Sequence, residues 1–104
     1  MDIKMIVSLK EKIDLASDLF YKQKNTEGYQ ILVGVIDGLM AITSDLKAAE
    51  QNESMLTFQR EFTERLQEIT EAMLQKDTIL IADMMKYDIM ELLDELMELE
   101  NKQE

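Results

Sequence analysis

Residues 6–20 read IVSLKEKIDLASDLF, and their apolar or small residues recur at alternating steps of three and four positions. Ile6, Leu9, Ile13, Ala16 and Phe20 therefore fall on one side of a helix with about 3.6 residues per turn. A half-buried strand would instead alternate apolar and polar residues with a period of two. The stretch predicts an amphipathic helix over residues 2–22.

The same spacing recurs in three later stretches, which predict helices over residues 25–49, 54–75 and 78–100. Their apolar positions are, in chain order, Leu32, Val35, Leu39, Ile42 and Leu46; Met55, Phe58, Phe62, Leu66, Ile69 and Met73; and Ile81, Met85, Ile89, Leu92, Leu96 and Leu99. Each set forms one continuous stripe, so each helix is expected to bury one side against its neighbours.

Short polar breaks separate the predicted helices. Asn25 or Thr26 is expected to cap the second helix, residues 51–54 form the next break, and Asp77 or Thr78 caps the fourth helix. Short connections join antiparallel neighbours, so residues 1–104 are predicted to form one all-α domain, an up-down-up-down four-helix bundle. The alternative is a three-helix core with a mobile first helix.

Composition limits the chemistry that the chain can perform. It contains no proline, cysteine, histidine or tryptophan, so the side chains that most often serve redox, zinc or acid–base chemistry near neutral pH are missing. We therefore expect no cofactor. The net charge of −11 disfavours binding to nucleic acid or to anionic membranes. The first residues do not resemble a secretory signal, which predicts a cytoplasmic protein.

The fourth predicted helix carries a second apolar stripe beside its main one. Several of the chain's nine methionines fall here, and flexible thioether side chains adapt to partners of different shape. This stripe and its flank predict a partner-binding face, formed by Asp83, Met84, Tyr87, Met90, Leu93 and Met97. The alternative is that the helix packs against two neighbours within the bundle.

Three small residues in the second predicted helix form another candidate contact surface. Gly34, Gly38 and Ala41 fall on a side away from the main apolar stripe, where a second backbone could approach closely. Each glycine costs about 1 kcal/mol relative to alanine inside a helix, so a close helix contact would offset this cost. A locally weak or kinked helix is the alternative.

Carboxylates at helical spacing raise one enzymatic possibility. Glu61 with Glu64, and Glu91 with Asp94, are pairs three residues apart, and two such pairs on neighbouring helices could hold Mg²⁺. This pattern resembles that of the all-α nucleotide pyrophosphohydrolases of the MazG type. The resemblance implies magnesium-dependent hydrolysis of a nucleoside triphosphate, although the chain shows no basic cluster for the phosphates.

Residues 76–89, KDTILIADMMKYDI, carry a second resemblance. Asp77, Ala82, Asp83 and Tyr87 match the Asp-x4-Ala-Asp-x3-Tyr pattern of a family of small uncharacterised helical proteins from low-GC Gram-positive bacteria. Asp88 stands where a glutamate is more typical, and methionines replace leucines at residues 84 and 85. That family is loosely similar to flagellar export chaperones, which implies a chaperone-like role toward a partner helix.

These observations predict a non-catalytic protein-interaction module, an adaptor or chaperone-like protein that binds a partner helix on its Met-rich face. Self-association as a homodimer fits the same surfaces. Two alternatives remain at this point: a magnesium-dependent nucleotide pyrophosphohydrolase, and an acidic decoy that binds a basic protein.

Overall fold

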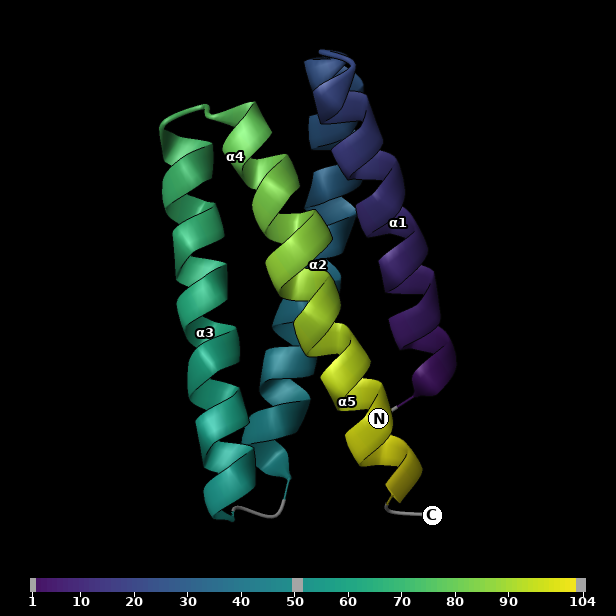
Figure 1. The fold of residues 1–104 in the computed structure, drawn as a ribbon, viewed down its shortest axis with the longest axis vertical. Helices are drawn as coiled ribbons and strands as arrows, with labels where there is room; N and C mark the ends of the chain where they lie inside the picture. The colour runs from purple at the N-terminus through teal and green to yellow at the C-terminus, as the bar shows by residue number, and fades with distance from the viewer. Residues whose placement is uncertain (1, 50–51, 103–104) are drawn as a thin grey trace.

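The computed structural model describes residues 2–49 and 52–102, which form helices packed side by side (Figure 1). The chain runs through α1 (Ile3–Tyr21), α2 (Asn25–Ala48) and α3 (Glu53–Leu74). A last continuous rod consists of α4 (Thr78–Asp83), the π-helical segment η1 (Met84–Ile89) and α5 (Met90–Lys102). The four rods alternate in direction, so the predicted all-α bundle is confirmed. Their ends lie within two residues of the predicted ranges.

Side-chain caps fix three of the helix starts. Asp2 accepts a hydrogen bond from the Lys4 amide at 2.9 Å, and Asn52 accepts one from the Met55 amide at 2.8 Å. Asp77 accepts one from the Leu80 amide at 3.1 Å, as predicted. The predicted cap of α2 is wrong, because the helix already begins at Asn25 and its cap residue, Lys24, makes no side-chain cap hydrogen bond. Residue 51 of the predicted break lies outside the described residues.

Both hairpin turns end their first helix with the same backbone motif. Gln23 and Lys76 adopt left-handed φ angles of 62° and 56°. After α1, the Lys24 amide donates to the Leu19 carbonyl at 2.8 Å; after α3, the Asp77 amide donates to the Ala72 carbonyl at 3.0 Å. These are Schellman motifs, which usually contain glycine at the left-handed position.

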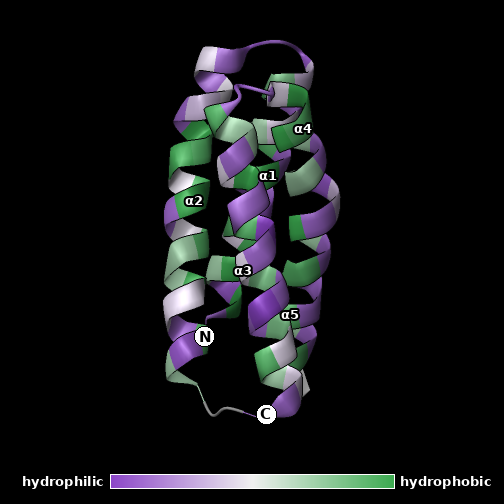
Figure 2. Ribbon diagram, turned by 90° about the vertical axis from the view of Figure 1, so that its left-hand side faces the viewer, coloured by the Kyte–Doolittle hydropathy of each residue, from purple (hydrophilic) through white to green (hydrophobic). Residues whose placement is uncertain are grey.

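The apolar stripes of all four rods meet in one core, and Figure 2 shows hydrophobic and hydrophilic bands alternating along the helices. Every stripe residue named above for the first two helices is buried, and Phe20 and Phe62 are among the largest fully buried side chains. Leu66, Met73 and Leu99 are only partly buried. Within the described part of the chain, no helix has the length and apolar character needed to span a membrane.

The first helix is an integral part of the bundle. Ile6, Ile13 and Phe20 are fully buried, and α1 packs against α2, α4 and α5. The alternative of a three-helix core with a mobile first helix is therefore wrong. The Phe20 ring also packs edge-on against Tyr29, with ring centroids 5.1 Å apart, and so fastens the start of α2 to the end of α1.

The small residues of α2 do not form one contact surface. A Cβ atom added to Gly38 would lie 2.8 Å from the Leu9 side chain, so this glycine permits close packing of α2 against α1. A Cβ atom added to Gly34 would meet nothing within 4 Å, and Ala41 is exposed. A different glycine, Gly28, lies directly against the Phe20 ring.

Replacing Gly34 with alanine is expected to raise the free energy of unfolding by about 1 kcal/mol, because the methyl group enters open space and favours the helix. Gly28→Ala is the matched comparison, since its Cβ would lie 2.8 Å from Cε1 of the buried Phe20 ring. This second change should lower stability by about 1–3 kcal/mol. Urea unfolding followed by circular dichroism measures both effects, and equal effects from the two substitutions would contradict this packing.

Candidate functional site

The predicted Met-rich face lies largely inside the molecule. Met84 is 6% exposed and Leu93 is fully buried, while Met90 and Met97 are half-buried against the core. The last rod packs against α1 along its length, and at α4 and η1 it packs against α3 as well. Of the six residues predicted for partner binding, only Asp83 and Tyr87 are exposed.

The segment that joins α4 to α5 is π-helical, and this was not predicted from the sequence. Its residues, Met84–Ile89, form a wider turn than the α-helix on either side. Met85 and Ile89 point into the core, whereas Tyr87 is 63% exposed. Asp83, which was predicted to bind a partner, accepts a hydrogen bond from the hydroxyl of Tyr21 on α1.

The hydrogen bond between Tyr21 and Asp83 links the first and last rods at the surface. The carboxylate accepts a hydrogen bond from the phenolic hydroxyl, and this bond, together with some burial and the negative charge of Asp83, raises the pKa of Tyr21 to about 12. The Lys86 ammonium lies 5.6 Å from the centroid of the Tyr21 ring, within range of a cation–π contact. This cluster has its partners within the chain, so we interpret it as structural.

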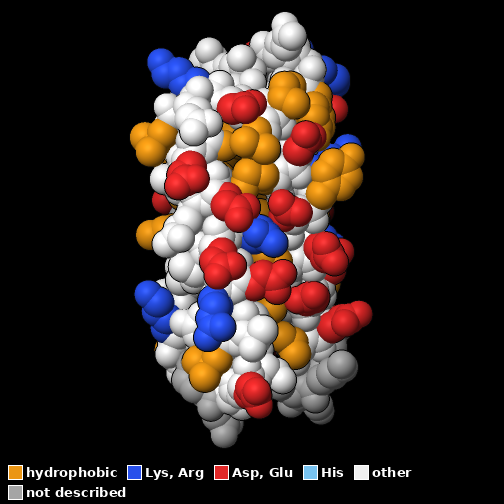
Figure 3. Space-filling view, turned by 60° about the vertical axis from the view of Figure 1, so that its left-hand side comes forward, with side chains coloured by type: hydrophobic (Ala, Val, Ile, Leu, Met, Phe, Trp, Pro, Cys, Tyr) orange, Lys and Arg blue, Asp and Glu red, His pale blue; other side chains and the backbone are white. Residues whose placement is uncertain are grey.

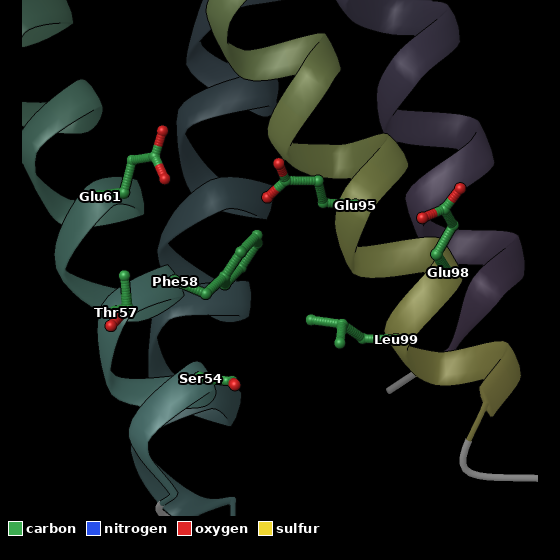
Figure 4. Close-up of a pocket in the computed structure, with 7 residues that line it drawn as sticks. All are labelled: Ser54, Thr57, Phe58, Glu61, Glu95, Glu98 and Leu99. Carbon is green, nitrogen blue, oxygen red and sulfur yellow. The ribbon is translucent and has the colours of Figure 1, made fainter.

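A cleft opens where α3 and α5 diverge. Figure 1 shows α5 inclined away from α3 toward the lower end of the bundle. The cleft has a volume of about 240 Å³ and is lined by Ser54, Thr57, Phe58 and Glu61 of α3 and by Glu95, Glu98 and Leu99 of α5. Phe58 and Leu99 extend toward each other from opposite walls, and Glu95 points across toward α3 (Figure 4). The opening thus combines an apolar base with acidic walls.

Packing of the last rod explains why the cleft is open. Its upper parts, α4 and η1, pack against both α1 and α3, whereas α5 packs on α1. Leu92, Leu93 and Leu96 are buried, so the apolar surface of α5 is already covered where it faces the core. As a result, α5 does not close over the first turns of α3, and the cleft lies between them.

The carboxylate of Glu95 lies near three other carboxylates. Partial burial raises the pKa of Glu95, and the charges of Glu61, Glu91 and Glu98 raise it further. Glu61 belongs to the opposite wall, while Glu91 and Glu98 lie four and three residues away on the same helix. The cleft therefore brings these negative charges close enough to add to the effect of burial on Glu95.

Two acidic residues of α3 and α5 outside the cleft have cationic partners among the described residues, but those of the cleft do not. Lys10 of α1 pairs with Asp94, and Arg65 pairs with Glu68 at 2.9 Å. Among the residues that the structure describes, neither Lys nor Arg lines the cleft or pairs with Glu61, Glu95 or Glu98. Figure 3 shows acidic side chains gathered across the middle and lower right of a face that includes α3 and α5.

A family model described as a domain of unknown function, DUF8042, matches residues 3–99. The chain belongs to this family. The match spans all four rods and includes every residue that lines the cleft. No curated protein and no solved structure shows significant similarity to the chain.

The four carboxylates predicted as a magnesium site are not gathered in this DUF8042 chain. Glu61 lines the cleft, whereas Glu64 lines a separate depression on α3 beside Leu56 and Arg60. Asp94 pairs with Lys10. Across residues 2–49 and 52–102, no three acidic, histidine or cysteine side chains are grouped so that they could hold a metal ion. The predicted quartet of Glu61, Glu64, Glu91 and Asp94 is therefore not one site.

A second depression of this DUF8042 bundle lies between α2 and α3. It has a volume of about 520 Å³ and is lined by Met40, Thr43, Lys47, Thr63, Leu66, Gln67, Thr70 and Glu71. The hydroxyls of Thr43, Thr63 and Thr70 donate to backbone carbonyls of their own helices at 2.9–3.0 Å. This depression contains both Lys47 and Glu71, whereas the α3–α5 cleft is lined by carboxylates without Lys or Arg among the described residues, so the cleft is the stronger candidate site.

Tyr21 is expected to ionise at a pKa of about 12 instead of its ordinary 10.0. Because the folded-state pKa is the higher one, the stability that the hydrogen bond contributes is present below pH 10 and is lost as pH rises toward 12. Stopped-flow pH jumps monitored by tyrosinate absorbance should show a component near pH 12 that disappears in Tyr21→Phe and persists in Tyr87→Phe. If Tyr21→Phe instead removes a component near pH 10, Tyr21 ionises at its ordinary pKa, and the hydrogen bond is contradicted.

Glu95→Gln is expected to stabilise the fold at pH 7 by about 0.5 kcal/mol, the scale of like-charge pairs on one helix face. The gain should shrink as pH falls, because the raised folded-state pKa of Glu95 lets the wild-type carboxyl take up a proton and lose its repulsion. Asp94→Asn is the control, since that charge is paired with Lys10 and its removal should not stabilise. Thermal melts between pH 4 and pH 8 provide the measurement; a loss of stability in Glu95→Gln would disprove crowding of the carboxylates.

Proposed function

We propose that this protein is a non-catalytic interaction module that binds a helical segment of a partner protein in the cleft between α3 and α5. The observation that carries the proposal is an opening between two helices with apolar side chains, Phe58 and Leu99, facing each other at its base. Burial of a partner's apolar side chain between them would contribute about 1.5–3 kcal/mol. This is the helix-in-groove mode, in which an amphipathic helix lays its apolar side into a gap between helices.

The size of the cleft favours a protein segment over a small molecule. Pockets for small ligands commonly have volumes of about 300–1,000 Å³ and enclose most of the ligand. The cleft is smaller, at about 240 Å³, and its two walls are helices that run along the length of the molecule. A segment that lies across the opening and inserts one or two side chains fits these dimensions.

The side chains in the cleft also favour binding over catalysis. They are two hydroxyls, two apolar groups and three glutamates, and the Thr57 hydroxyl donates to the Glu53 carbonyl at 3.0 Å. A general base paired with a nucleophile would need these groups to bond to one another, and no hydrogen bond joins them in the described part of the chain.

A partner of different sequence fits the cleft better than a second copy. A homodimer would bring a second net charge of −11 toward an acidic opening, which Coulomb repulsion disfavours. The chaperone-like class rests on the resemblance of residues 76–89 to small bacterial helical proteins that are similar to flagellar export chaperones. Such chaperones shield a helix of another subunit, and a cleft of this kind would serve that purpose.

The test uses a synthetic amphipathic peptide of roughly 18 residues, with leucines at helical spacing and uncharged glutamine flanks. Fluorescence anisotropy should show the labelled peptide binding to the full-length protein. Leu99→Gln removes an apolar side chain from the cleft and is expected to weaken binding about tenfold, which corresponds to about 1.4 kcal/mol.

Leu56→Gln is the matched control, because Leu56 is an exposed leucine of α3 that lies outside the cleft. It should leave the peptide affinity unchanged, and thermal melts should show that both variants fold. Absence of peptide binding, or equal weakening by Leu99→Gln and Leu56→Gln, would rule out the cleft as the binding site.

A further inference from the structure

We infer that the segment bound in the α3–α5 cleft is a basic amphipathic helix, whose lysine or arginine side chains flank its apolar positions and pair with Glu61, Glu95 and Glu98. The inference rests on the proposed function and adds the chemistry of the partner. An apolar helix alone would satisfy Phe58 and Leu99 but would leave the acidic walls without counter-charges.

The glutamates are placed on both walls of the cleft. Glu61 belongs to α3, while Glu95 and Glu98 belong to α5. In Figure 4, Glu95 points across toward α3, Phe58 and Leu99 lie below Glu61 and Glu95, and Glu98 extends along the α5 side. A helix that inserts an apolar side chain would bring the residues three and four positions away to either wall. Lysine or arginine at those positions would reach the carboxylates, whereas aspartate or glutamate there would be repelled.

Two carboxylates of α3 and α5 that lie outside the cleft differ from those inside it in having cationic partners among the described residues. Outside it, Asp94 and Glu68 have cationic partners within the chain, through Lys10 and Arg65. Inside it, the described residues supply no Lys or Arg to Glu61, Glu95 or Glu98. Burial raises the pKa of Glu95, and the charges of Glu61, Glu91 and Glu98 raise it further, so part of the shift reflects this gathered negative charge. A cationic partner would relieve this repulsion, so charge complementarity adds to the apolar contact.

The experiment compares three peptides with the same leucine pattern and flanks of lysine, glutamine or glutamate, each titrated against the full-length protein. The lysine peptide is expected to bind about tenfold more tightly than the glutamine peptide at low salt, and the glutamate peptide most weakly. In the double variant Glu61→Gln/Glu95→Gln, the lysine peptide should bind no more than about twofold more tightly than the glutamine peptide.

Glu64→Gln/Glu71→Gln is the matched control, because it changes the net charge equally but alters residues of α3 that line other depressions. It should keep most of the lysine preference. If both double variants lose that preference equally, only the overall charge matters and the inference fails. It also fails if Mg²⁺ or spermine at equal charge displaces the peptide completely, or if moderate salt abolishes its binding, as expected of an acidic decoy.

The outcomes separate this inference from the proposed function. Binding of the glutamine peptide with no preference for lysine would retain the cleft as a helix-binding site and overturn the basic partner. Failure of every peptide to bind would overturn both.

Discussion

The last helical rod must bury apolar side chains on two sides. The arrangement of the other helices around it depends on this burial. Met85, Ile89 and Leu96 are fully buried, as are Ala82 and Leu93 on the neighbouring side. Hydrophobic burial is the main favourable contribution to folding, so the rod lies where two neighbours can cover it. At α4 and η1 these neighbours are α1 and α3, whereas α5 follows α1. The divergence of α3 from α5 is the consequence, and it leaves the cleft open.

Part of the negative charge of the chain is concentrated in the open cleft. Most of the net charge of −11 lies in residues 53–104, which contain fourteen acidic and five basic residues. Some of these carboxylates are held by cations of the same chain, and Lys10 with Asp94 also joins α1 to α5. Those in the cleft remain close together and unpaired within the described residues, next to apolar side chains. A surface of this kind is suited to a partner that is both apolar and basic.

The helices and most of the core could be predicted from the sequence, because burial of one helix side imposes a spacing of three and four residues. Ile6 and Leu32 illustrate this directly, since both are fully buried. Gln23 and Lys76 were not predicted as left-handed turn residues, because glycine is the usual signal at such positions. The π-helical segment has no comparable signal in the sequence. The cleft could not be predicted either, because it depends on the relative tilt of two helices, which the spacing of apolar residues does not determine.

The proposed cleft requires that α3 and α5 hold unpaired carboxylates next to apolar side chains. Carbon-13 NMR titration of the Glu95 side-chain carboxyl tests it most directly, with Glu95→Gln used to assign the signal. In the free protein, we expect the pKa of Glu95 to lie above its ordinary value of 4.5. Saturation with the lysine-flanked peptide should lower that pKa, because a neighbouring cation favours the ionised form. A pKa of Glu95 at or below 4.5 in the free protein would contradict the account.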